Sequence, residues 1–376
     1  MHDKLRLETL AVHAGHEPET GDHGLAPAFK PATTFLRDAD GGFAAGHQYA
    51  RASNPTRARL ENALALLEGG GEALCFSSGM AAVGAVFAQL APGDHAIVSG
   101  DAYHGAIRFI DDWLKPRGIG VTYCDTSDTG NIERELQPKT RLLWLESPSN
   151  PELKITDLAA VAALAANRGI LTACDATLAT PVLQRTLDHG IDIVMHSSTK
   201  YLGGHSDLLG GVLATRDAEL AAGLRAWQID GGAVPSAFDC WLLLRSLATL
   251  PLRVKQHAES ARRIAAWLTE QTAVEKVFYP GLAAHPGHET AKRQMRDFGG
   301  MVSFLFRGDE DATRAVASRT KIFQQATSLG GVESLIEHRA SVEGAQRRSA
   351  HNLLRLSVGL EHADDLIADL SQALKE

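Results

Sequence analysis

The feature that most constrains the fold is an alternation of short apolar runs with helix-like stretches, which begins near residue 57. Short apolar runs separated by helical segments are typical of a parallel sheet whose two faces are covered by helices. The pattern therefore predicts a large α/β domain over residues 57–240. Its expected strands are 73–76, 95–99, 120–124, 141–146, 170–174, 191–195 and 211–214.

The segments on either side of this region have different patterns. Residues 1–56 are rich in glycine and proline and show little periodicity, which predicts an extended arm. Residues 241–376 begin within a helical stretch near 237–270. After this stretch, helix-like and strand-like patterns follow one another, which predicts a smaller α+β domain. Its expected elements are a strand at 301–306, a helix at 310–318, a strand at 353–358 and a helix at 363–374. An alanine-rich helix is also expected at 157–168, capped by Thr156 or Asp157.

The overall charge excludes some classes of partner. The formal net charge is −8, whereas nucleic acids and anionic membranes call for a basic face. The chain contains no apolar run of about 18 residues, so no transmembrane helix is expected. The first residues lack the basic-then-apolar layout of a signal peptide. A small-molecule substrate is the expected partner, with neither nucleic acid nor membrane.

The cysteines and histidines do not predict a metal site. The cysteines are far apart and lack the spacing of metal ligands, so we expect free thiols in a reducing cytoplasm. They are Cys75, Cys124, Cys174 and Cys240. His13 and His16 have a spacing that could bind a metal, but the arm offers no third convergent ligand.

Polar groups follow several predicted strands, where ligands bind in open α/β sheets. Asp175 closes the run 170–174, small residues fill 77–82 before a helix, and 197–204 reads Ser-Ser-Thr-Lys-Tyr-Leu-Gly-Gly. A carboxylate at a buried strand end calls for a cation, and a helix start can bind a phosphate. Each group has a purely structural alternative as well: a helix-capping aspartate, an ordinary strand–helix turn, or a solvated lysine.

The residues next to Lys200 are those that a cofactor-binding lysine requires. It lies beside the hydroxyls of Ser197 and Thr199 and before the Gly203-Gly204 turn. Hydroxyls can bind a phosphate, and a lysine whose pKa is lowered can form an imine with an aldehyde. Together with Asp175, a partner for a protonated pyridine nitrogen, these residues predict a pyridoxal 5′-phosphate (PLP) site.

With these segments in place, the chain resembles the Cys/Met-metabolism PLP enzymes from about residue 7 to residue 374. This family comprises cystathionine γ-synthase, γ-lyase and β-lyase, methionine γ-lyase and the homoserine-ester sulfhydrylases. The longest matching stretches are 175–181 and 196–207. The resemblance implies the PLP-dependent transferase fold of type I, with a large, mostly parallel sheet domain and a smaller C-terminal α+β domain.

The resemblance also implies roles at the cofactor. Lys200 would carry PLP as a Schiff base and move protons, and Tyr103 would stack on the ring and help to activate the incoming amine. Asp175 would contact the ring nitrogen. The remaining cofactor contacts would come from Ser197, Thr199 and the N–H groups of Gly79 and Met80 at the phosphate, from Thr177 beneath the ring, and from Asn150 near the phenolic oxygen.

The arm resembles a segment that reaches a neighbouring subunit. In Tyr49-Ala50-Arg51, followed by Asn54-Pro55-Thr56, the Tyr49 and Arg51 side chains would bind the cofactor phosphate of a second chain. A site shared between chains implies an obligate dimer, and such dimers commonly pair, so a homotetramer is expected.

The substrate residues are implied in the same way. Arg355 would grip the α-carboxylate through its bidentate guanidinium, with Asn150, Ser328 and Ser334 nearby. Arg108 and Glu333 match residues of the cystathionine-handling members. Gln48 stands where cystathionine γ-lyases have a glutamate for the distal ammonium of the substrate.

The leading hypothesis is a γ-elimination lyase that acts on cystathionine or a related γ-substituted amino acid and gives a 2-oxo acid and ammonia. The alternatives are γ-replacement from an O-acylhomoserine and cysteine, a canavanine γ-lyase-like activity and, less favoured, β-elimination. Gly105 argues against methionine γ-lyase, which characteristically has a cysteine there. A non-catalytic PLP-binding regulator is disfavoured because every expected chemical residue is present. The loop 338–346 departs from the family pattern, and Lys30 and Arg339 receive no role.

Overall fold

The computed structural model describes residues 5–17, 23–343 and 347–375. The predictions for residues 1–4 and 18–22 of the arm and for residues 344–346 of the 338–346 loop lie outside this part. No helix among the described residues is long and apolar enough to cross a lipid bilayer.

A seven-stranded sheet forms the larger half of the molecule, in the order β1-β7-β6-β5-β4-β2-β3. Strands β3, β2, β4, β5 and β6 run parallel, whereas β7 is antiparallel to both β6 and β1. The prediction of a mostly parallel sheet is confirmed. The strands are β1 Glu72–Phe76, β2 His95–Ser99, β3 Gly120–Cys124, β4 Thr140–Glu146, β5 Leu171–Asp175, β6 Ile193–Ser197 and β7 Gly211–Thr215.

Strand β6 begins two residues later than the apolar run 191–195 suggests. The carboxylate of Asp192 accepts hydrogen bonds from the backbone N–H and the hydroxyl of Thr172, at 2.8 and 2.7 Å. Asp192 therefore joins β5 to the start of β6 through its side chain instead of through the backbone ladder. The shift places Ser197 at the last position of β6, at the carboxyl end of the sheet.

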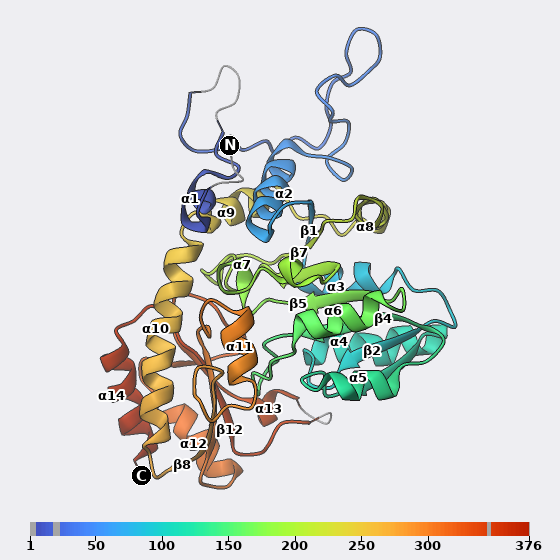
Figure 1. The fold of residues 1–376 in the computed structure, drawn as a ribbon. Helices are drawn as coiled ribbons and strands as arrows, with labels where there is room; N and C mark the ends of the chain where they lie inside the picture. The colour runs from blue at the N-terminus through green and yellow to red at the C-terminus, as the bar shows by residue number, and fades with distance from the viewer. Residues whose placement is uncertain (1–4, 18–22, 344–346, 376) are drawn as a thin grey trace.

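Helices cover both faces of this sheet, because successive side chains of a strand point to opposite sides (Figure 1). Val98, Trp144 and Met195 pack on one side against α3, α4 and α8, while Ile97, Leu143 and Cys174 pack on the other against α5 and α6. The helices are α2 Pro55–Glu68, α3 Gly79–Phe87, α4 His104–Phe109, α5 Thr129–Glu135, α6 Leu158–Ala166, α7 Thr180–Leu183 and α8 Ala218–Gly231. Asp157, and not Thr156, caps α6 by accepting the N–H of Ala160 at 3.1 Å.

A second sheet follows in the C-terminal third, in the order β10-β11-β12-β9-β8. Its strands are β8 Val274–Phe278, β9 Met301–Phe306, β10 Gln324–Gln325, β11 Leu335–His338 and β12 Leu353–Ser357. Helices α10, α12 and α14 pack against it around Phe304, Leu354 and Leu356. The helices here are α9 Ala237–Leu247, α10 Leu250–Thr269, α11 His288–Gln294, α12 Glu310–Arg319, α13 Arg339–Glu343 and α14 Ala363–Leu374.

Three details depart from the sequence pattern. The helical stretch predicted near 237–270 is divided at residues 248–249, and Pro251 lies in the first turn of α10, where proline needs no N–H partner. The position 240–241 proposed as a domain boundary falls inside α9. Strands β8, β10 and β11 were not predicted; in β11 the Leu-Ile-Glu-His sequence places a charged residue in a short buried strand.

The arm is mostly extended but contains one helix that was not expected, α1 Leu7–His13. Leu10 and Ala11 of α1 are buried in the same core as α2 and α10. Residues 23–53 form a long loop that extends away from both sheets (Figure 1).

Asp369 provides a test of how α14 is held. Its carboxylate accepts hydrogen bonds from the backbone N–H groups of Lys321, Ile322 and Phe323, at 2.8, 2.8 and 3.0 Å. Asp369→Ala should destabilise the fold by about 2–3 kcal/mol, because buried donors lose their acceptor, and Asp369→Asn should cost less. Thermal unfolding measures this, with the exposed Asp365→Asn as control. Equal melting temperatures for all variants would contradict this account.

Candidate active site

A cavity of about 400 Å³ lies where the carboxyl ends of β4, β5 and β6 face residues of the second sheet. Its lining includes these residues singled out from the sequence: Gly79, Met80, Tyr103, Asn150, Asp175, Thr177, Ser197, Thr199, Lys200, Ser328 and Arg355. Ligands of open α/β sheets bind at this edge. The topology therefore brings together residues that are far apart in the chain.

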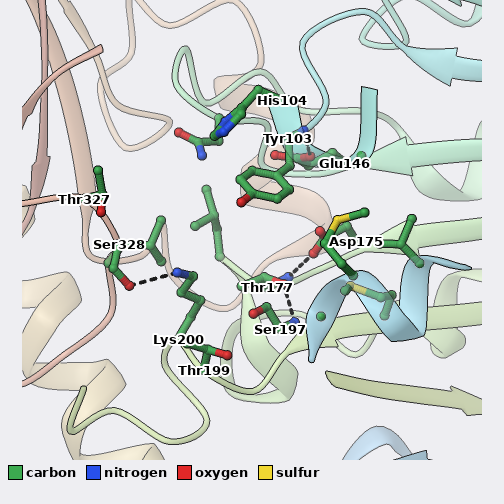
Figure 2. A pocket seen from close by; sticks show the side chains of 18 of the residues that line it. Tyr103, His104, Glu146, Asp175, Thr177, Ser197, Thr199, Lys200, Thr327 and Ser328 are labelled. Carbon is green, nitrogen blue, oxygen red and sulfur yellow. Dashed lines mark hydrogen bonds between the residues drawn. The ribbon is translucent and has the colours of Figure 1, made fainter. Parts of the chain in front are cut away.

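Lys200 follows β6 and reaches into the cavity (Figure 2). Its Nζ donates a hydrogen bond to Ser328 Oγ at 2.8 Å. Burial lowers the pKa of this amine, the charge of Arg355 lowers it further, and Glu337 and Asp175 act in the opposite direction. A larger fraction of Lys200 is therefore neutral and nucleophilic at a given pH than of an ordinary lysine.

Asp175 and Glu146 are register partners at the ends of the parallel strands β5 and β4. Burial raises the pKa of Asp175, whereas hydrogen bonds from Thr177 lower it; the Thr177 N–H lies 2.9 Å from Asp175 Oδ1. Burial also raises the pKa of Glu146, and the charge of Asp175 adds to this rise. Two carboxyl groups side by side favour a cation in the cavity, which would hold Asp175 in its ionised form.

The hydroxyl groups and the start of α3 form a cradle for an anion. Thr177 Oγ1 accepts the N–H of Ser197 at 2.8 Å, and Thr199 Oγ1 accepts the N–H of Gly210 at 3.1 Å. Ser78 caps α3 by accepting the N–H of Ala81. The N–H groups of the first helical turn lack intrahelical acceptors, so those of Gly79 and Met80 can bind a phosphate.

Tyr103 points its ring into the cavity from the side opposite Lys200 (Figure 2). The residue immediately precedes α4, and its N–H donates to Glu146 Oε2 at 2.8 Å. Its side chain is 41% exposed, which leaves a ring face open to a planar ligand. The Glu146 contact fixes the backbone from which this ring projects.

Arg355 lies in β12 and is 4% exposed. Its Nη1 donates to Asn150 Oδ1 at 3.1 Å, and its Nη2 donates to Ser328 O at 2.8 Å. Nη2 also lies 2.8 Å from a carboxylate oxygen of Glu337. Burial lowers the pKa of Arg355 to about 10, so the group is still charged at neutral pH. These contacts fix its orientation at the cavity wall.

The other substrate residues named from the sequence do not line this cavity. Ser334 bonds to Glu361 and accepts the N–H of Gly359, and Glu333 accepts a hydrogen bond from Ser206. Arg108 lines an adjoining cavity. Their suggested roles stay predictions.

The arm residues also lie elsewhere in the single chain. Gln48, Tyr49 and Arg51 line a separate hollow with Ile229, to whose carbonyl Arg51 donates at 2.7 Å. One chain does not test the predicted contact of Tyr49 and Arg51 with a neighbouring subunit or the predicted substrate role of Gln48.

Sequence reasoning gave no role to several residues that line the cavity. The ionisable ones among them are His104, Glu146, Glu337 and Arg339. Glu146 ends the apolar run 141–146 as Asp175 ends its own, so the same strand-end pattern could have identified it. Glu337 was not found because β11 was not recognised as a strand.

Comparisons with known proteins agree with this geometry. A model of the family described as "Cys/Met metabolism PLP-dependent enzyme" matches residues 8–375. The chain belongs to this family. It is 45% identical over 372 residues to cystathionine gamma-synthase of Mycobacterium tuberculosis, covering 97% of this chain and 96% of the relative. It is 41% identical over 380 residues to cystathionine gamma-lyase of Dictyostelium discoideum, covering 99% and 98%.

A solved structure is similar over the same length. The structure of metB from Corynebacterium glutamicum matches with a TM-score of 0.97 and 41% identity, covering 100% of this chain and 99% of that one. The resemblance found in the sequence and the predicted type I fold are confirmed. The protein is a PLP-dependent enzyme.

The cavity residues fit this cofactor. A Cβ on Gly79 would lie 3.0 Å from both Cβ and Oγ of Ser197, so a side chain at this position would push the Ser197 hydroxyl away by a few tenths of an ångström. The close approach of these two residues builds an anion cradle at one side of the cavity. Asp175 suits a protonated ring nitrogen, and Lys200 provides the amine that an aldehyde requires.

The lowered pKa of Lys200 predicts how the apoenzyme takes up PLP. Only the neutral amine attacks an aldehyde, so the uptake rate should rise with pH around a midpoint below the ordinary lysine value of 10.5. Stopped-flow absorbance across a pH series measures this midpoint, with N-acetyl-lysine as the reference amine. The same midpoint for enzyme and reference would show that the cavity does not tune Lys200.

Proposed function

We propose that this enzyme eliminates the γ-substituent of an amino acid such as cystathionine or a related sulfur or oxygen compound. The reaction breaks the bond between Cγ and the substituent and consumes one water; it releases the protonated substituent (a thiol, such as cysteine from cystathionine, or an oxygen compound), a 2-oxo acid and ammonia. The observation that carries the proposal is the amine of Lys200, held by Ser328 between Asp175 and Arg355 in one cavity. The relatives named cystathionine gamma-lyase support this reaction.

The position of each residue in the cavity gives it a separate role in the proposed reaction. Arg355 binds the substrate α-carboxylate through the guanidinium donors that face the cavity. Lys200 Nζ then takes the proton from Cα, as its lowered pKa allows. PLP, when bound, supplies a ring that takes up the negative charge formed at Cα. Asp175 keeps the nitrogen of this ring protonated. Tyr103 covers the side of the cavity that lies opposite Lys200.

Ser328 links the two central groups. Its hydroxyl accepts from Lys200 and its carbonyl accepts from Arg355, at 2.8 Å in both cases. Its φ of 88° lies in a region that non-glycine residues rarely adopt. This conformation directs the hydroxyl and the carbonyl of one residue to two different partners. Ser328 thereby couples the position of the base to that of the carboxylate clamp.

A second candidate is γ-replacement, in which cysteine takes the place of an acyl group on homoserine. The 45% identity to mycobacterial relatives named cystathionine gamma-synthase favours it. Both reactions need the same groups at Cα and differ in whether water or a thiol completes the reaction. Lys200, Asp175 and Arg355 therefore serve either outcome.

We also propose that two chains build each site and that the dimers pair into a homotetramer. The arm carries Tyr49 and Arg51 away from the cavity of their own chain, and two of its apolar side chains, Leu25 and Leu36, are at least 95% exposed. Apolar side chains at this exposure favour coverage by a partner surface.

The four free cysteines, three of them buried, support a reducing cytoplasmic location.

The reaction type can be decided by product analysis. The purified enzyme should release 2-oxobutanoate from cystathionine and from O-acylhomoserines, and added cysteine should divert the acylhomoserine to cystathionine if replacement dominates. Lys200→Ala should lower turnover by about 10³-fold or more, since it removes the base, and should abolish the visible absorbance of lysine-bound PLP. No keto acid at millimolar substrate, with or without cysteine, would rule out both reactions.

Shared sites can be tested by mixing inactive chains. Differently tagged Lys200→Ala and Arg51→Ala chains are co-expressed, and the mixed oligomer is purified through both tags. One site of a mixed dimer then carries both substitutions and the other carries neither, so activity should return to roughly half of the wild-type value. Each variant purified alone serves as control. A mixed oligomer no more active than its parents would refute the shared site.

A further inference from the structure

A buried arginine holds the turn of the arm that carries Tyr49 and Arg51. Arg57 lies in the first turn of α2 and is 2% exposed. Its Nη1 donates to the carbonyl of Ala50 at 2.8 Å, and its Nη2 donates to the carbonyls of Arg51 and Ala52, at 3.2 and 2.9 Å. One side chain thus binds three consecutive backbone carbonyls of the arm.

These carbonyls belong to a tight turn of the chain. The N–H groups of Ala52 and Ser53 both donate to the carbonyl of Tyr49, at 2.9 and 3.0 Å. Carbonyls at the end of such a turn need donors, as those at the end of a helix do. Arg57 supplies donors to three of them, so the shape of residues 49–53 depends on its guanidinium group.

The position of Arg57 is costly without these contacts. The helix dipole opposes a cation in the first turn of a helix. The carboxylate of Glu61 compensates only in part: it lies 3.8 Å from Arg57 Nε, whereas it accepts closer contacts from the Cys75 N–H at 2.9 Å, from Gln228 at 3.0 Å and from Arg225 at 2.7 Å. The short contacts of Arg57 therefore go to the arm.

The turn presents two side chains away from the cavity of its own chain. The Arg51 guanidinium lies over the Tyr49 ring, 5.9 Å from its centroid, and donates to the carbonyl of Ile229 in α8. The Tyr49 side chain is 48% exposed. The directions of both side chains are set by the backbone of residues 49–51, and Arg57 binds the carbonyls of two of these residues.

We propose that Arg57 is a positioning residue for the cofactor site of a neighbouring subunit. It fixes the turn from which Tyr49 and Arg51 reach the cofactor phosphate of the second chain, and it does not touch the cofactor itself. The inference rests on the proposed sharing of sites between two chains. A displaced turn weakens the phosphate contacts in the neighbour's cavity and leaves Lys200 and Asp175 of that cavity in place.

Cofactor affinity measures this role without any substrate. The apoenzyme of each variant is titrated with PLP, and the visible absorbance of the lysine-bound cofactor gives the dissociation constant. Arg57→Met should raise this constant about tenfold, the size of one charge-assisted contact to the phosphate. Arg57→Lys should raise it less, because it keeps a charged donor. An unchanged constant in Arg57→Met would overturn the proposal.

Arg319→Met is the matched control for the loss of an arginine–carbonyl contact. The Arg319 Nε donates to the carbonyl of Ala373 at 2.9 Å, in the C-terminal third of the chain and away from the arm. This substitution should leave the dissociation constant for PLP unchanged.

A double-mutant comparison separates positioning from a general effect on the fold. In a chain that already lacks both arm groups, Tyr49→Phe/Arg51→Ala, the additional Arg57→Met substitution should not raise the dissociation constant further, because residues that act through one another do not add. A further rise of the same size as in the wild-type background would mean that Arg57 acts independently of the arm groups. That result would overturn the proposal.

Mixed oligomers show whose site Arg57 serves. In a dimer of Lys200→Ala and Arg57→Met chains, one site combines Lys200 with an intact arm and the other has neither. This dimer should bind PLP with wild-type affinity and about half of the wild-type absorbance. In a dimer of Arg51→Ala and Arg57→Met chains, every site receives a defective arm, so all sites should bind PLP weakly.

The dimer of Lys200→Ala and Arg51→Ala chains is the reference. If this reference lacks a tight site, sites are not shared, and the role of Arg57 fails together with the shared site. If the reference has a tight site and the Lys200→Ala/Arg57→Met dimer lacks one, Arg57 serves its own chain and only the present proposal fails. Absence of γ-elimination affects neither readout, because no substrate is used.

A variant that folds keeps the test decisive. If Arg57→Met yields no folded protein, Arg57→Lys takes its place in the same pairs. The same pattern is then expected with a smaller rise of the dissociation constant, and tight binding by the Arg51→Ala/Arg57→Lys dimer would overturn the proposal.

Discussion

The constraint on which the site depends is the pairing of two carboxyl groups at the ends of adjacent parallel strands. Asp175 and Glu146 are register partners, and burial raises the pKa of both. Such a pair is costly in an apolar interior unless a cation comes close to it. The cavity therefore suits a ligand with a protonated ring nitrogen, and Lys200 and the anion cradle at α3 complete the match to PLP.

The second sheet supplies Arg355, the residue that we propose as the substrate's carboxylate clamp. Its β12 carries Arg355, and the loop before β11 carries Ser328, which contacts Lys200 of the first sheet. One hydroxyl and one carbonyl of Ser328 thereby connect the base to the carboxylate clamp. Because base and clamp come from different sheets, the distance between them depends on how the two sheets pack. At this junction Glu337 contacts both Arg339 and Arg355, at 2.9 and 2.8 Å.

Specificity and reaction type are separable in this architecture. The groups at Cα are shared by elimination and replacement, so they do not choose between the two. A second cavity, of about 540 Å³, adjoins the first and is lined by many charged residues: Asp101, Arg108, Asp125, Glu152, Lys154, Arg339, Glu343 and Arg348.

The sequence by itself determined the cofactor and most of the sheet. Each strand of the first sheet overlaps one of the predicted apolar runs, with β6 shifted by two residues, and the Ser-Ser-Thr-Lys segment with Asp175 identified PLP. These features are local. A strand that is buried on two faces is a run of consecutive apolar residues, and a strand-end carboxylate directly follows such a run. Only the tertiary structure decided that Glu146 faces Asp175, that Glu337 serves both Arg355 and Arg339, and that Ser334 turns to Glu361. Such pairings join residues from different strands or loops, and their partners are fixed by sheet register and packing, which no single stretch of sequence encodes.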